Sequence, residues 1–321
     1  MASITTVIPV YNGERFISDT LDSLAKQTVP PDRVVVIDDC STDRTEQIVR
    51  DFKGLNIDWA PNQRNLGLFP NHNSALRFAP ETEYLHILHA DDVILPTFFE
   101  KLVPLVEHAK GFALAFGGHV FVREDGSRTE QKLTVASDRP RQLSTGEFLG
   151  SLSELKAIQL HSAVMKTSHQ ALPVSFRTDF PQVADVIFHA ELASICSEIW
   201  AHPDILCHVR IHSNNVSNKN MLNINAWVLD EWRAMQEVYA LMEKQHVAGW
   251  MRRQKLKLLF GARSRVKVKT VRDFDPNYAK QIASVAKDKV GVLNYSAACG
   301  VVALRDALFP AANSSAERLK K

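Results

Sequence analysis

Tyr84-Leu85-His86-Ile87-Leu88 is a short apolar run, and His89-Ala90-Asp91-Asp92 follows it directly. The run predicts a buried strand, and two adjacent carboxylates at the end of such a strand repel each other. A divalent cation that carries phosphates would relieve the repulsion, because Mg²⁺ and Mn²⁺ prefer oxygen ligands. A solvated turn would contain the same residues, since Asp is common in turns. On this stretch alone, both interpretations, a metal site and a solvated turn, stay possible.

Three further strands are expected before this one: a β-branched run at Ile4–Val10, a fully apolar run at residues 34–37 and a third strand at residues 55–60. Helical patterns separate the runs, and Asn12 is available as the N-cap of the first helix. Alternation of strands and helices predicts an α/β fold of the Rossmann-like type, with a mostly parallel sheet, right-handed crossovers and helices on both faces.

Three of these strands end in turn residues or carboxylates: Tyr11-Asn12-Gly13, Asp38-Asp39 and Asp91-Asp92. A parallel sheet brings these ends to one edge, where ligands of open α/β sheets bind. The sequence contains neither a Walker motif nor GxGxxG, so a metal is expected to offset the phosphate charge. The pattern predicts a site for a nucleoside diphosphate and its metal ion.

Composition restricts the class of protein. The chain has 321 residues, a formal net charge of +2 and four cysteines. The charge balance gives no general attraction to nucleic acid. The cysteines form no CxxC pair, which fits a reducing compartment and argues against a zinc site. No signal-like or membrane-spanning run is present, so we expect a cytoplasmic protein.

Four motifs occur in order within the first hundred residues: residues 6–13, residues 36–43, Asn65-Leu66-Gly67 and His89-Ala90-Asp91-Asp92. Together they resemble the family 2 glycosyltransferases. The resemblance implies a GT-A fold and inverting transfer of a sugar from a nucleotide diphosphate donor. Processive members add a Gln-x-x-Arg-Trp motif and membrane helices, which this sequence lacks, so transfer of one sugar is expected.

The resemblance also implies roles for individual residues. Pro9, Tyr11 and Asp39 would line the pocket for the base and ribose. Asp91 and Asp92 would form the DXD-type motif, with Asp91 near the ribose and Asp92 on the Mn²⁺ or Mg²⁺ that bridges the diphosphate. These assignments are expectations for the structure to test.

The general base is expected at Asp185. The family carries a Glu-Asp pair at a helix start here, and this chain has Ala184-Asp185. A carboxylate at a helix N-terminus stays ionised because the helix dipole favours its charge, which suits a base for an acceptor hydroxyl. A plain helix cap is the alternative. Asp179 and Glu191 are the substitute candidates.

Residues 209–217 resemble the family segment that closes over the donor. A neutral imidazole can complete a metal shell, so His212 is a candidate metal ligand, although a structural histidine fits equally well. Strands are also expected at residues 112–116, 119–123 and 157–165.

The composition changes after residue 217, so we expect a glycosyltransferase domain at 1–217 and a helical region at 218–321. Residues 250–269 are basic and interleaved with large apolar side chains. This pattern predicts a helix that lies on an anionic membrane, or the solvated basic face of an ordinary helix. A dimer surface and an acceptor-side lid are further roles open to the region.

The sequence therefore predicts a metal-dependent glycosyltransferase that uses a UDP-sugar and a saccharide or lipid-linked saccharide acceptor, in cell-surface polysaccharide synthesis. A nucleotidyltransferase of similar fold is one alternative, although residues 10–13 lack its Gly-rich loop. A catalytically silent, membrane-associated binding module is the other, and only the missing Glu at position 184 supports it.

Overall fold

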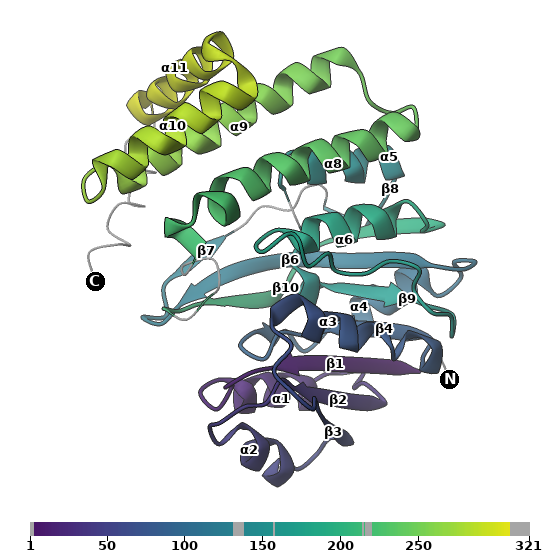
Figure 1. Ribbon diagram of the computed structural model, residues 1–321. Helices are drawn as coiled ribbons and strands as arrows, with labels where there is room; N and C mark the ends of the chain where they lie inside the picture. Colours follow the sequence, from purple (N-terminus) through teal and green to yellow (C-terminus); the bar gives the residue numbers. More distant parts are fainter. Residues whose placement is uncertain (1–2, 131–137, 157, 214, 216–219, 309–321) are drawn as a thin grey trace. The chain divides into compact units, whose positions relative to one another are not determined.

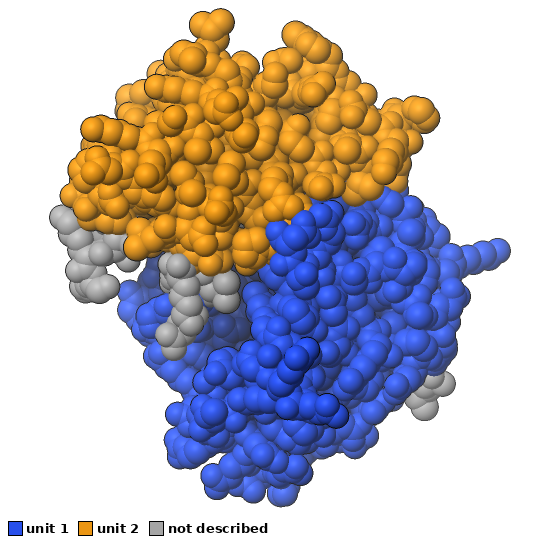
Figure 2. Space-filling view, in the orientation of Figure 1, with its two compact units in different colours: residues 1–151, 156–179, 184–215 blue, residues 152–155, 180–183, 216–321 orange. Residues whose placement is uncertain are grey.

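The computed structural model describes residues 3–130, 138–156, 158–213, 215 and 220–308. The chain divides into two compact units (Figure 2). Unit 1 comprises residues 1–151, 156–179 and 184–215, and unit 2 comprises residues 152–155, 180–183 and 216–321. The second unit thus takes two short segments from within the predicted first domain, and the main division falls between residues 215 and 216 rather than after 217.

Unit 1 is built on one sheet with the strand order β3-β2-β1-β4-β9-β6-β10-β5, while β7 pairs with β6 and β8 with β10 (Figure 1). The strands are β1 (Ile4–Val10), β2 (Arg33–Asp38), β3 (Ile57–Pro61), β4 (Tyr84–Ile87), β5 (Val93–Ile94), β6 (Ala113–Arg123), β7 (Arg128–Glu130), β8 (Arg141–Leu143), β9 (Ala163–Lys166) and β10 (Glu198–Ile211).

The first four strands of the chain form a parallel block, as predicted. β1 lies between β2 and β4 and pairs with both in parallel, and β3 adds to β2 in the same direction. All seven residues of β1 are buried. One face packs on α1 (Ile17–Ala25), α2 (Thr45–Asp51) and α4 (Phe98–Val106), while α3 (Leu68–Leu76) packs on β1 and β2 outside that cluster. The α/β fold expected from the sequence is confirmed.

The rest of the sheet is mixed in direction. β9 is antiparallel to β4 and β6, whereas β6 and β10 are parallel. Two strands were expected at residues 112–116 and 119–123, but β6 is one strand of eleven residues that runs through Gly117 and Gly118. A Cβ at Gly117 would lie 2.6 Å from Cδ1 of Leu206 on β10, so this glycine permits close strand contact rather than ending a strand.

The strand expected at residues 157–165 is shorter and later. The described part of that segment contains a 3-10 turn, η2 (Leu160–Ser162), before β9 begins at Ala163. A second 3-10 turn, η1 (Ala79–Glu81), precedes β4. Two further helices of the fold are α5 (Thr145–Ser153) and α6 (Ala184–Ala193). Residue 157 lies outside the described residues.

Unit 2 is helical. Its elements are η3 (Asn220–Leu222), η4 (Asn225–Leu229), α8 (Asp230–Lys244), α9 (Trp250–Val271), α10 (Pro276–Val290) and α11 (Val292–Leu308). Its core joins apolar side chains of η4, α8, α9, α10 and α11, among them Met235, Phe260 and Ile282. Across the described residues, every helix is too short or too polar to span a bilayer.

A buried ion cluster lies inside unit 2. Glu231 on α8 accepts two hydrogen bonds from Arg263 and lies 2.8 Å from Nζ of Lys267, both on α9. Burial lowers the pKa of Lys267 to about 8, and the charge of Glu231 opposes this shift. Two of the cations in the basic segment 250–269 therefore pair within the unit, and contact of this segment with a membrane stays a prediction.

Candidate active site

The loops after β1 and β2 are joined by hydrogen bonds. The amide of Asn12 donates to Oγ of Ser41 at 2.8 Å, and Oδ1 of Asn12 accepts from the amide of Thr42 at 2.8 Å. Asn12 has a φ of 51°, and α1 begins only at Ile17, without a side-chain cap. The expected N-cap role of Asn12 is therefore wrong, because its side chain holds the neighbouring loop instead.

Asp39 organises the loop after β3. Its carboxylate accepts hydrogen bonds from the amides of Leu66 and Gly67, each at 2.8 Å, and from Nδ2 of Asn62 at 2.9 Å. The residue is 2% exposed. These hydrogen bonds engage the carboxylate fully with the loop of residues 62–67. They hold the backbone of that loop at the sheet edge where the predicted pocket residues lie. Pro9 is buried within β1, whereas Tyr11 is 54% exposed.

Asp91 and His212 meet at the same edge. Nε2 of His212 lies 3.0 Å from Oδ2 of Asp91, although 121 residues separate them. The two residues meet because His212 directly follows Ile211, the last residue of β10, which runs through the sheet. The ring of Phe16 packs 4.7 Å from the His212 ring. The Asp91 side chain is 30% exposed, so a solvent ligand can reach it.

Asp92 faces inward. It is 2% exposed, and its Oδ1 accepts a hydrogen bond from the amide of Arg210 at 2.8 Å. Its Oδ2 lies 3.3 Å from Nδ1 of His89 and 3.1 Å from Nδ1 of His161. The sequence assigned the metal to Asp92 and His212, but His212 lies against Asp91, while the oxygens of Asp92 face the Arg210 amide, His89 and His161. The expected roles, with Asp91 near the ribose and Asp92 on the metal, stay a prediction, and the proposal below instead places the donor metal beside Asp91 and His212.

The pKa values of the two histidines beside Asp92 are shifted in opposite directions. Burial opposes protonation of His89, but its hydrogen bond to Asp92 and the charges of Asp92, Asp91 and Asp185 outweigh it, so the pKa of His89 is raised. Burial and the charge of His89 hold the pKa of His161 well below its usual value. Neither histidine had a predicted role, and His161 falls in the segment that was expected to be a strand.

Asp185 lies in the first turn of α6 and is half-buried. Its charge is the smallest of the contributions that raise the pKa of His89. The substitute candidate Asp179 is half-exposed and forms an ion pair with Arg177 at 2.7 Å. The other substitute candidate, Glu191, lies further along α6, and the choice of Asp185 as the base stays a prediction.

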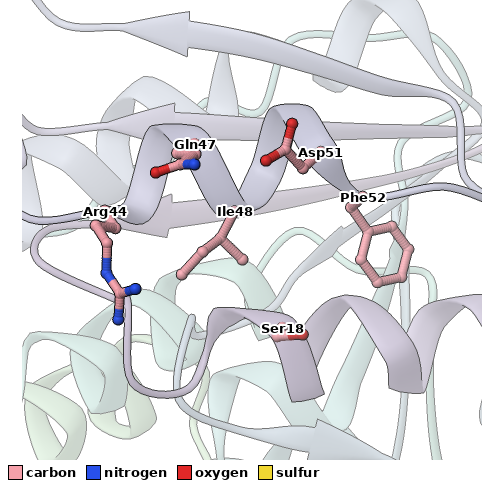
Figure 3. Close-up of a pocket in the computed structure, with 6 residues that line it drawn as sticks. All are labelled: Ser18, Arg44, Gln47, Ile48, Asp51 and Phe52. Atoms are coloured by element: carbon pink, nitrogen blue, oxygen red, sulfur yellow. The ribbon is translucent and has the colours of Figure 1, made fainter.

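A hollow of about 360 Å³ lies elsewhere on unit 1, between α1 and α2 (Figure 3). Its lining comes from one residue of α1 and from α2 and its flanks: Ser18, Arg44, Gln47, Ile48, Asp51 and Phe52. The site residues predicted above are all described, and none of them lines this hollow. We therefore place the candidate site at the strand edge rather than in the hollow.

Comparison with known families adds to this geometry. The model of the family described as glycosyl transferase family 2 matches residues 5–166, which is half of the chain. The chain belongs to glycosyl transferase family 2. The match covers the parallel block with Asp39, Asp91 and Asp92, and stops before Asp185 and His212.

Curated relatives of this family 2 chain match over short segments. An uncharacterized glycosyltransferase of Methanocaldococcus jannaschii, MJ1057, is 29% identical over 128 residues, which are 39% of the chain and 44% of the relative. Poly(ribitol-phosphate) beta-N-acetylglucosaminyltransferase TarS of Staphylococcus aureus is 40% identical over 99 residues, which are 29% of the chain and 17% of TarS. The chain therefore spans less than half the length of these two relatives.

Solved structures share the fold. TarS residues 1–349 in complex with UDP-GlcNAc superposes with a TM-score of 0.59 at 18% identity, covering 94% of the chain and 92% of the TarS chain. A mannosyltransferase of Pyrobaculum calidifontis in complex with GDP-Man and Mn²⁺ gives 0.51 at 18% identity, covering 95% and 87%. The GT-A fold expected of a family 2 member is confirmed.

Proposed function

We propose that the chain transfers one sugar, with inversion, from a UDP-sugar to a hydroxyl of a saccharide or lipid-linked saccharide in cell-surface polysaccharide synthesis. The observation that carries the proposal is the pairing of Asp91 with His212 at 3.0 Å, just beyond the end of β4, the neighbour of β1, in a family 2 chain. The TarS structure with UDP-GlcNAc supports the choice of donor.

The donor base and ribose would lie against Pro9, Tyr11 and the loop that Asp39 holds. The carboxylate oxygens of Asp39 already accept hydrogen bonds from the amides of Leu66 and Gly67 and from Asn62. We therefore infer that Asp39 positions this loop rather than binding the donor directly. Tyr11 offers an exposed ring on which a base can stack. The planar base would thus stack on the ring of Tyr11 and contact the backbone of the loop that Asp39 holds.

A divalent cation, Mn²⁺ or Mg²⁺, fits beside Asp91 and His212. The pair supplies one carboxylate oxygen and one imidazole nitrogen that face each other, and Asp91 is open to solvent ligands. When bound, the ion offsets the negative charge that develops on the departing nucleoside diphosphate. The chain's own contribution is to hold Asp91 and His212 together through β10.

Asp185 would take the proton from the acceptor hydroxyl as that oxygen attacks the anomeric carbon. Its position in the first turn of α6 favours the ionised carboxylate, because the N-terminal end of a helix carries partial positive charge. Attack from the face opposite the leaving diphosphate gives inversion. A base placed in this way contributes about 10²–10⁴-fold to the rate.

The test measures donor binding by calorimetry and product release by chromatography, for UDP-sugars with and without Mn²⁺. Asp91→Ala should abolish manganese-dependent donor binding and lower turnover more than about 100-fold, since metal stabilisation of charge is worth several kcal/mol. Asp185→Asn should keep the donor Kd and lose about 10²–10⁴-fold in kcat. Asp288→Ala, on an exposed part of α10, is the control and should change neither.

The products decide between the enzyme classes. Release of nucleoside diphosphate with a glycosylated acceptor supports the proposal. Release of pyrophosphate would instead identify a nucleotidyltransferase. If the chain binds the donor but neither hydrolyses it nor transfers its sugar to any saccharide or lipid-linked saccharide tested, the chain is a binding module. That result would refute the proposed transferase activity.

A further inference from the structure

A cluster of three potential ligands lies beneath the strand end that carries Asp91. His89, Asp92 and His161 each present one ligand atom, and these atoms all lie within 4.8 Å of one another. His89 and Asp92 come from the loop after β4, and His161 comes from η2. Two segments of unit 1 that are far apart in sequence therefore converge on one point.

The cluster contains an unsatisfied buried group. The His161 side chain is 0% exposed, and neither of its ring nitrogens has a hydrogen-bond partner within the described residues. Its Nδ1 lies 3.1 Å from Oδ2 of Asp92, but without hydrogen-bond geometry. Buried polar atoms are nearly always paired, so an imidazole left in this state points to a missing partner.

The spacing of the atoms fits a coordinated ion. A tetrahedral site with bonds of about 2.0–2.1 Å places neighbouring ligand atoms about 3.3 Å apart. The printed separations from Oδ2 of Asp92 are 3.3 Å to His89 and 3.1 Å to His161. Small shifts of three side chains would therefore enclose an ion, with the fourth position left for a water molecule.

Surrounding contacts hold the ligands in place. The amide of Arg210 holds the other oxygen of Asp92 at 2.8 Å, and the backbone carbonyl of His161 lies 3.0 Å from Nε2 of His86. The hydroxyl of Thr20 donates to the carbonyl of Asp92 at 2.8 Å. Such outer contacts are typical of metal sites, where they orient the ligands.

We propose that His89, Asp92 and His161 form a second metal site, which binds a divalent transition ion of the zinc type. Two imidazoles and one carboxylate match Zn²⁺ and its neighbours in the first transition row, whereas Mg²⁺ is expected to require more oxygen ligands. The site is separate from the Asp91 and His212 pair and does not depend on the proposed sugar transfer. The ion would fix the loop that presents Asp91.

The test uses the full chain, stripped with a chelator and then dialysed against Zn²⁺. We expect about one zinc per chain by elemental analysis, and with Co²⁺ the strong visible absorption of a tetrahedral site. His89→Ala and His161→Ala should each weaken zinc binding by more than about 100-fold, beyond the 10–100-fold cost of losing an outer contact. His89 is partly exposed, so this variant serves if His161→Ala does not fold.

Two control variants separate the outcomes. His108→Ala removes an imidazole that is 93% exposed and should keep zinc binding unchanged. His212→Ala should keep the zinc while losing manganese-dependent donor binding. No zinc on the wild-type chain would overturn the inference. So would zinc that stays in His89→Ala and leaves in His212→Ala, because that ion would belong to the donor site.

Discussion

Acid should destabilise unit 1 because of three buried neutral histidines. Burial lowers the pKa of His72 to about 3, with the charge of His89 adding to the effect. Burial likewise lowers the pKa values of His86 and His189 to about 4. In the unfolded chain each imidazole returns to a pKa of about 6.5. The stability that these groups contribute is therefore present above pH 6.5 and is lost as the pH falls towards their folded pKa values.

The size of the loss follows from these values. Between pH 7 and pH 5 each histidine costs about 1.8 kcal/mol of unfolding free energy, because the unfolded chain gains a proton that the folded chain excludes. Three such groups give about 5–6 kcal/mol, comparable with the total stability of a small domain. The raised pKa of His89 acts in the opposite direction, since its contribution grows as the pH falls, and it reduces the net loss.

Urea unfolding followed by circular dichroism, at half-unit steps from pH 7.5 to pH 5, measures this effect. His189→Leu should lower the pH dependence by about 1.8 kcal/mol over this range, whatever it does to absolute stability. His108→Gln changes an exposed imidazole and should leave the dependence as it is. An unfolding free energy that is constant from pH 7 to pH 5 in the wild type would refute the argument.

Two further changes test packing. Asp39→Ala leaves the amides of Leu66 and Gly67 without their acceptor, so the unfolding free energy in urea should fall by about 3 kcal/mol; an unchanged midpoint would mean that water replaces the carboxylate at no cost. Glu231→Gln leaves the buried Lys267 charge without its carboxylate partner, so unit 2 should lose about 3–5 kcal/mol in the same assay. A loss below about 1 kcal/mol would contradict this account of the ion cluster.

Much of unit 1 could be predicted because its signals are local. The four parallel strands follow from short β-branched or apolar segments separated by helical patterns. Convergence of Asp39 and Asp91 at one edge follows from strand direction alone. The prediction divided β6 at Gly117-Gly118, whereas the strand continues because the neighbouring β10 comes close: a Cβ at Gly117 would meet Leu206, and one at Gly118 would meet the backbone of Asp204.

The parts that could not be predicted depend on distant contacts. His161 has no local signal for its position, because its neighbour in the fold, Asp92, lies 69 residues earlier in the chain and belongs to another segment. The choice of Asp91 rather than Asp92 as the neighbour of His212 depends on which way two adjacent side chains turn. Asn12 was misassigned because a loop partner 30 residues away competes with the helix for its side chain.

The path of β10 has a consequence for how the protein is made. β10 pairs with β6 on one side and with β5 on the other, and it ends one residue before His212. During synthesis the chain must therefore reach about two-thirds of its length before β5 gains its partner and Asp91 its histidine. Contacts of such long range are formed late, after much loop entropy has been lost. A nascent chain that has completed only the parallel block therefore contains Asp39 and Asp91 but still lacks the contact between Asp91 and His212.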